Sequence, residues 1–237
     1  MKLTGDYHTH SKYSKNNHGK NTIKEMVISA KEKGLEAYGI SDHGPSHFMF
    51  GIKRKNLLKA RKEIDELKKE FGGKLYLSVE ANLIGKDGKI DIKDEEINIL
   101  DHLFVGYHRG TINNITNPLR KWFNKEKQKQ INTQAYLNLL DKYNVTAITH
   151  LNTYIKVDLA KVLSKAAEKG TLIEINNKHM NFEDKDVPIL IASGCKFIIS
   201  SDAHRKEDVG NVSKALDFVK RNKIPLDRIV NIDKLYK

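Results

Sequence analysis

Seven short apolar segments alternate with amphipathic segments along the sequence, and six of the seven are followed within two residues by histidine, aspartate or glutamate. The segments, each expected to form a strand, cover residues 3–9, 37–41, 75–79, 103–107, 145–149, 171–175 and 195–200. Strands that alternate with helices favour a parallel sheet with right-handed crossovers. A closed barrel brings all carboxyl strand ends to one rim, whereas an open doubly wound sheet gathers ligands only near its switch point. The pattern therefore predicts an α/β fold, a seven-stranded (β/α) barrel with its site at the carboxyl rim.

The helices expected between these strands are defined by caps and by apolar residues at helical spacing. Thr22 followed by Glu25 has the sequence of a capping box, and Gly34 ends the apolar stripe behind it. Further helices are expected at residues 57–71, 94–100, 159–169, 184–193 and 212–222, and in a segment that ends at residue 143. Residues 109–130 show no regular pattern, so we expect a loop with at most one helical turn that serves as a lid.

Composition limits the class of protein. A chain of 237 residues is expected to form one domain over residues 1–237. Its one cysteine, Cys195, excludes an internal disulfide, and no leader or long apolar run is present, so we expect a cytoplasmic protein without membrane contact. Lys and Arg exceed Asp and Glu by 42 to 30, a formal charge of +12. The surplus lysines are interspersed with acids on predicted helix faces, which indicates a solvated surface rather than a nucleic-acid partner.

The first strand carries the sharpest motif, Asp6-Tyr7-His8-Thr9-His10. Side chains alternate faces in a strand, so His8 and His10 point the same way and can bind one ion. Such a pair taken alone is more often solvated or hydrogen-bonded, but further metal-capable residues follow at later strand ends. These are His43, Glu80, His108, His150, Asp202 and His204. His102, at the opposite end of the fourth strand, is expected to be structural, whereas His47 and His179 lie on rim loops, with a surface position slightly favoured.

These motifs resemble the PHP (polymerase and histidinol phosphatase) family over nearly the whole chain. The resemblance rests on Asp6-Tyr7-His8-Thr9-His10, Ser41-Asp42-His43-Gly44, Val79-Glu80-Ala81-Asn82, Gly106-Tyr107-His108, Ile148-Thr149-His150 and Ser201-Asp202-Ala203-His204. Glu174-Ile175-Asn176-Asn177 is most similar to the stand-alone YcdX-like phosphatase branch. The family resemblance implies a distorted TIM-like barrel of seven strands with a trinuclear metal centre.

The resemblance also implies a ligand set for three divalent ions. The first ion would be held by His8, His10, Glu80 and Asp202; the second by Glu80, His108 and His150; and the third by His18, His43 and His204. Imidazole and carboxylate ligands suit zinc, manganese or iron. Asp42 is expected to orient a ligand imidazole, and Glu174 and Asn176 to support the rim.

A site with three divalent ions and only two anionic ligands stays net positive, which favours an anionic substrate and supplies metal-bound hydroxide. We therefore expect a metal-dependent phosphatase acting on a small-molecule phosphate monoester, such as histidinol phosphate or a sugar or nucleoside phosphate. Its catalytic groups would be Glu80, Asp202 and His204, and its substrate contacts Arg109, Arg205 and His179. A DNA-directed nuclease of the same family and a non-catalytic, metal-stabilised regulatory domain remain alternatives. The proton donor to the leaving group and the oligomeric state stay open.

Overall fold

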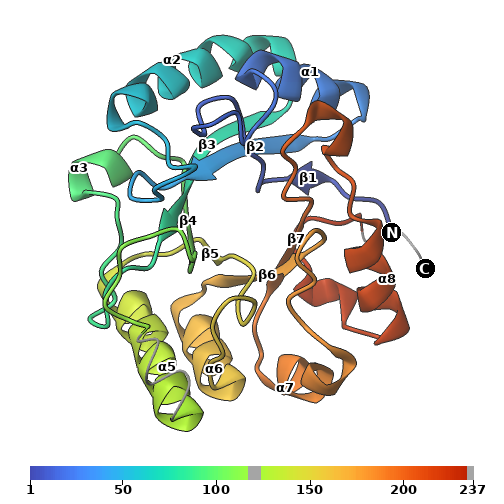
Figure 1. Ribbon diagram of the computed structural model, residues 1–237. Coiled ribbons are helices and arrows are strands. Elements are labelled where there is room, and N and C mark those ends of the chain that lie inside the picture. The colour runs from blue at the N-terminus through green and yellow to red at the C-terminus, as the bar shows by residue number, and fades with distance from the viewer. Residues whose placement is uncertain (117–123, 234–237) are drawn as a thin grey trace.

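The computed structural model describes residues 1–116 and 124–233. Seven parallel strands form one sheet in the order β1-β2-β3-β4-β5-β6-β7, at the centre of a ring of helices (Figure 1). The strands are β1 (Gly5–Asp6), β2 (Ala37–His43), β3 (Lys74–Asn82), β4 (His102–Gly106), β5 (Ala147–Ile148), β6 (Leu172–Asn176) and β7 (Phe197–Ser200). The predicted seven-stranded barrel is confirmed. Over the same two stretches of chain, no helix has the length and apolar character needed to span a membrane.

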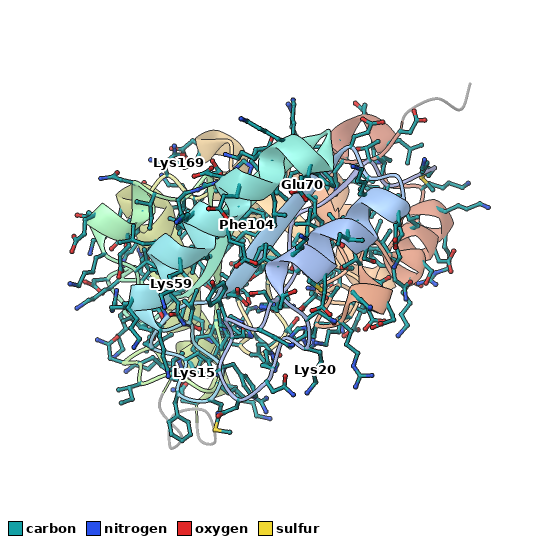
Figure 2. All side chains as sticks on the ribbon, turned by 90° about the horizontal axis from the view of Figure 1, so that it is seen from above. Lys15, Lys20, Lys59, Glu70, Phe104 and Lys169 are labelled. Carbon is teal, nitrogen blue, oxygen red and sulfur yellow. The ribbon has the colours of Figure 1, made fainter. Side chains whose placement is uncertain are left out.

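Helices surround the sheet, and all of them except the four-residue α3 bury side chains on one face. They are α1 (Ile23–Glu32), α2 (Arg54–Phe71), α3 (Asp94–Ile97), α5 (Lys125–Lys142), α6 (Leu159–Lys169), α7 (Val187–Ala192) and α8 (Ser213–Arg221), with short 3-10 turns η1 (Asp184–Asp186), η2 (Lys206–Asp208) and η3 (Leu226–Arg228). The capping box of Thr22 and Glu25 forms as expected. Charged side chains such as Lys59, Glu70 and Lys169 cover the outer layer (Figure 2).

Several predicted boundaries are wrong. The first strand was expected over residues 3–9, but β1 has only two residues. Thr9 lies outside it and pairs with Ala203 through an isolated bridge. Helix α2 begins at Arg54 rather than at residue 57, and α5 already begins at Lys125, inside the expected loop. Polar first turns carry no apolar periodicity, so the sequence pattern detects a helix start late. The rest of the predicted lid falls partly on residues 117–123, outside the described residues.

The interior of the barrel is small and separate from the main core. Phe104 and Ala147 form a buried cluster with Ile198, whereas Leu103 and Val105 belong to the larger core outside the sheet. This division follows from the alternation of side chains along β4. His102 has ring contacts to Tyr7 and Tyr76 at the end of β4 that is remote from Gly106, as a structural residue would.

The first and last strands are joined largely by side chains. Thr9 and Ala203 form a parallel bridge, with the His10 N–H donating to Ala203 O at 2.8 Å. Next to it, the buried Asn231 side chain donates to Gly5 O and Ile199 O, both at 2.7 Å, and accepts from Ile199 N at 3.0 Å. One amide therefore replaces the backbone partners that a continuous strand pair would provide.

Asn231→Ala should lower the free energy of unfolding by about 2–4 kcal/mol, because it leaves three buried backbone groups without partners. Urea denaturation followed by circular dichroism measures the loss. Asn138→Ala is the control, since that partly exposed side chain has a bond to Lys86 O on the surface, and it should cost less than 1 kcal/mol, roughly the value of an exposed hydrogen bond. Equal stability of the two variants would contradict the closing role of Asn231.

Candidate metal centre

The structure brings together all nine residues expected to bind metal. They lie at the carboxyl ends of the strands: His8 and His10 after β1, His18 in the following loop, His43 on β2, Glu80 on β3, His108 after β4, His150 after β5, and Asp202 and His204 after β7. Seven of them are buried, and His18 and His204 are partly exposed toward the rim. The site is therefore a pocket of imidazoles with two carboxylates inside it.

Glu80 lies between two pairs of imidazoles. Its Oε2 is 2.9 Å from His43 Nδ1 and 3.3 Å from His8 Nε2. Its Oε1 is 2.7 Å from His150 Nε2 and 3.3 Å from His108 Nε2. Each oxygen thus faces a different part of the cluster, which is the arrangement a bridging carboxylate needs.

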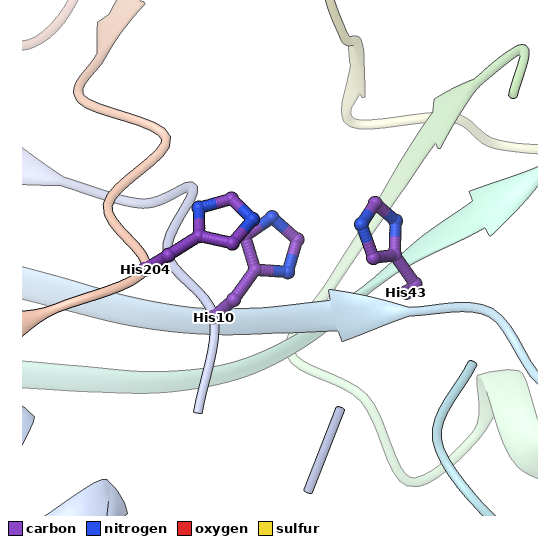
Figure 3. A group of neighbouring side chains, drawn as sticks. All are labelled: His10, His43 and His204. Carbon is purple, nitrogen blue, oxygen red and sulfur yellow. The ribbon is translucent and has the colours of Figure 1, made fainter. Parts of the chain in front are cut away.

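A second group of nitrogens converges on the other side. His10 Nε2 is 3.3 Å from Asp202 Oδ1 and 3.2 Å from His8 Nε2. His18 Nε2 is 3.2 Å from His43 Nε2 and 2.6 Å from His204 Nε2. Figure 3 shows the rings of His10, His43 and His204, which come from three separate elements, and their nitrogens lie within 4.8 Å of one another.

The cluster contains buried polar atoms whose hydrogen-bonding capacity the protein does not use and a metal ion could. Within the described chain, the buried atoms His10 Nδ1, His43 Nδ1 and Glu80 Oε2 make no well-formed hydrogen bond, although the last two lie 2.9 Å apart. Buried polar atoms without partners are costly, and facing imidazole nitrogens offer lone pairs that a cation can bind. Three sets of three ligand atoms are close enough to share an ion: His10, His43 and His204; His8, His10 and Asp202; and His43, Glu80 and His108.

Burial keeps several of these imidazoles neutral. It lowers the pKa of His18 to about 2, helped by neighbouring His204. It lowers the pKa of His43 to about 3, although the Glu80 carboxylate opposes it. Burial and the surrounding imidazoles also hold the pKa of His10 well below its usual value. Neutral imidazoles are the form that binds metal.

The two carboxylates remain anionic. Burial raises the pKa of Glu80, but the facing imidazoles of His108 and His8 outweigh burial and hold that pKa well below its usual range. The same balance, with His8 and His10 as the neighbours, lowers the pKa of Asp202. Both carboxylates therefore carry their charge near neutral pH and can face a bound cation.

Buried polar groups behind the cluster orient the rings. His8 Nδ1 donates to Glu174 Oε1 at 2.6 Å, and His108 Nδ1 donates to Asn82 Oδ1 at 2.7 Å. Each bond leaves the opposite ring nitrogen free to face the site. Asn176 donates to Glu174 and Asp202, both at 3.0 Å. No role for Asn82 was predicted, although its place two residues after Glu80 on one strand face was an available signal.

Asp42 does not orient an imidazole, so that prediction is wrong. Its carboxylate accepts from Ser11 N at 2.8 Å, Ser11 Oγ at 2.6 Å and Ser14 Oγ at 2.5 Å. It therefore orders the loop that carries His18. A buried carboxylate beside a flexible polar loop is paired by the nearest N–H and O–H donors, and the sequence does not show which loop will lie beside it.

His47 is buried, so the surface position slightly favoured for it is wrong. Its ring stacks on His43 with the centroids 5.0 Å apart, and its Nδ1 accepts from Phe50 N at 3.1 Å. His179 stays partly exposed, with Nε2 3.6 Å from Asp202 Oδ2. Lys178, which the sequence did not single out, places Nζ 2.8 Å from His204 Nδ1. The sequence feature that could have indicated Lys178 is its position directly after the rim residues Asn176 and Asn177.

The two arginines expected to contact substrate are exposed at the rim. The Arg109 guanidinium carbon lies 5.8 Å from the centroid of Tyr154, whose ring is 5.4 Å from that of His150. Arg205 is exposed, and within residues 1–116 and 124–233 no ion pair joins it to Glu207 or Asp208. The Arg109 guanidinium therefore stands near the site, and among the described residues neither arginine forms an ion pair with a carboxylate.

Backbone strain is concentrated at the same rim. His150 and Asp202 have positive φ angles of 29° and 55°, a conformation that side chains of this kind seldom adopt. Gly106 is needed beside them, because a Cβ there would lie 2.3 Å from Thr149 Oγ1 and 2.9 Å from His150 Cε1. Strain held in place by surrounding packing is typical of functional sites.

Comparisons with known proteins agree on one family. A model described as "PHP domain" matches residues 6–180. A protein of Thermoanaerobacter sp. described as a probable phosphatase is 31% identical, with 98% of this chain and 92% of the relative covered. A probable phosphatase of Shewanella sediminis is 28% identical, with 98% and 90% covered. The fold is similar to a histidinol phosphate phosphatase of Lactococcus lactis in complex with zinc, L-histidinol and phosphate, with TM-score 0.64, 19% identity and 94% of each chain covered.

Glu80→Gln should lose most of the metal that the wild-type protein retains after dialysis, because an amide cannot supply the charge that two ligand sets share. Elemental analysis measures the metal, and circular dichroism should show an intact barrel. Glu66→Gln, on the exposed face of α2, is the matched control and should keep its metal. Full metal content in Glu80→Gln would remove Glu80 from the ligand set.

Proposed function

The chain belongs to the PHP domain family, and on that basis we propose that it is a metal-dependent phosphatase acting on a small-molecule phosphate monoester. The observation that carries this proposal is the convergence of seven histidines on Glu80 and Asp202, with buried atoms in the cluster left without partners. The relatives described as probable phosphatases support it. The zinc, histidinol and phosphate bound to the Lactococcus protein, which shares the fold, support it further.

Three divalent ions, of zinc, manganese or iron, would be held by the cluster. His8, His10, Glu80 and Asp202 would hold one; Glu80, His108 and His150 a second; and His18, His43 and His204 the third. When bound, such ions supply Lewis acidity toward phosphoryl oxygens and lower the pKa of water toward neutrality. The number of ions and their identity are part of the proposal.

The protein groups around the cluster would orient the ligands, act in catalysis or contact the substrate. Glu174 and Asn82 fix the orientation of His8 and His108, so the ligand nitrogens need little rearrangement. Glu80, Asp202 and His204 are the catalytic residues of the proposal, since they would touch the reacting centre. At the rim, Arg109, Arg205 and His179 would contact the ester, and Lys178 adds a further cation next to His204.

The leaving group distinguishes members of this substrate class. Histidinol phosphate is supported by the complex of the Lactococcus protein, and sugar and nucleoside phosphates remain candidates. The proposal treats residues 1–237 as one domain, and the cytoplasmic location stays a prediction.

A substrate panel tests the proposed function. With added zinc or manganese, the protein should release phosphate from monoesters such as histidinol phosphate and fructose 1-phosphate. It should lose this activity on chelation and regain it when metal returns. A dinucleotide diester and single-stranded DNA complete the panel. Preferential cleavage of either diester would favour the nuclease alternative, and no turnover of any substrate would favour the regulatory one.

Arg109→Ala should raise KM for phosphate esters and weaken inhibition by inorganic phosphate by about tenfold, the lower range for a charge-assisted hydrogen bond at an exposed position. Its metal content should not change, since Arg109 is not one of the candidate ligands. Arg221→Ala, at the end of α8 and paired with Asp184, is the control. Unchanged KM and unchanged phosphate inhibition in Arg109→Ala would remove Arg109 from the substrate contacts.

A further inference from the structure

A positively charged cavity opens beside the candidate metal centre. It has a volume of about 310 Å³ and lies between the loops that follow β4 and β5 and the first turns of α5. Among the described residues, four cationic side chains line it, and no aspartate or glutamate does; the cations are Arg109, Lys125, Lys129 and Lys156. A cavity with several cations and no acid favours an anionic occupant.

Three of these cations form no ion pair with a described carboxylate. In the part of the chain that the structure describes, no ion pair to a carboxylate is formed by Arg109, Lys125 or Lys129. Lys125 and Lys129 are four residues apart on α5 and face the same cavity, so their charges repel each other. An anion between them would remove that repulsion.

The walls of the cavity are ordered by buried polar side chains. Asn132 accepts from Gln128 Nε2 at 2.8 Å and donates to Lys156 O at 2.9 Å. The hydroxyl of Thr153, which also lines the cavity, is buried and has no hydrogen-bond partner among the described residues. A polar ligand could therefore gain a donor there as well as the cations.

The cavity and the metal centre share one wall, the ring of Tyr154. That ring lies 5.4 Å from the His150 ring and 6.1 Å from the His108 ring, measured between centroids, and Arg109 lies over it at 5.8 Å. A ligand with its phosphoryl group at His108 and His150 could therefore reach past this ring into the cavity.

We propose that this cavity holds a second anionic group of the substrate, a phosphate or a carboxylate, so that the preferred ester is doubly anionic. The inference rests on the proposed phosphatase function and narrows its substrate class. It also disfavours histidinol phosphate, because the amine of histidinol is a cation at neutral pH and would enter a cavity lined by cations.

Steady-state kinetics of the metal-loaded enzyme test the inference on fructose 1,6-bisphosphate, fructose 1-phosphate and histidinol phosphate. We expect kcat/KM to be highest for the bisphosphate, by about tenfold over fructose 1-phosphate, and this ratio should fall as salt rises. Lys129→Gln should reduce the ratio several-fold, and Lys125→Gln, one helical turn earlier, should do the same. Lys127→Gln removes an equal charge from the same helix outside the cavity and should leave the ratio unchanged.

The outcomes separate this inference from the proposed function. Hydrolysis of all three esters with histidinol phosphate preferred, or with equal ratios in Lys129→Gln and Lys127→Gln, would overturn the second anion site and leave the phosphatase intact. If none of the esters is hydrolysed, the proposed function fails, and calorimetric binding of fructose 1,6-bisphosphate still tests the cavity. Weaker binding by Lys129→Gln than by Lys127→Gln would support the site, and equal affinity would overturn it.

Discussion

The rim of this barrel depends on one buried anion, the carboxylate of Glu80. A carboxylate this deeply buried is stable only when cations or strong donors surround it. Here Thr149 donates to Oε1 at 2.7 Å, and four imidazoles lie within 3.3 Å of the two oxygens. The imidazoles come from the ends of β1, β2, β4 and β5. Four separate segments of the chain therefore place an imidazole against one side chain of β3. Their arrangement is the strongest physical reason to regard the rim as a place for positive ions.

The contacts that close the barrel bring the candidate ligands after β7 to those after β1. Asn231 joins Gly5 to Ile199, and Asp6 accepts from Ser201 N at 3.2 Å and from Gly210 N at 2.8 Å. These contacts hold the loop after β7 against the start of the chain. Asp202 and His204 consequently meet His10, about two hundred residues away in sequence. Side chains, rather than a long strand ladder, bring the two ends of the fold together.

The rim combines two kinds of positive charge. Ions in the candidate metal centre would face the phosphoryl group, whereas the lysines and Arg109 of the neighbouring cavity are fixed charges supplied by α5 and the loop after β4. Tyr154 separates the two regions. In the proposed function, the metal ligands would decide which bond is broken, and the adjoining cavity would decide which molecule presents that bond. The chemistry and the selectivity of such a site can therefore change independently.

The sequence by itself determined the alternation of strands and helices and the residue at the end of each strand, because both depend on local periodicity and on the direction of parallel strands. It also indicated eight of the nine candidate ligands, since each lies at a strand end, and the family resemblance added His18 in the first loop. Tertiary structure alone decided that Asp42 binds the loop of Ser11 and Ser14, that His47 is buried against His43, and that Asn82 supports His108. It alone grouped Lys125 and Lys129 with Arg109 around one cavity. These are contacts between loops and elements far apart in sequence, and no local pattern encodes which donor, ring or charge will be the neighbour.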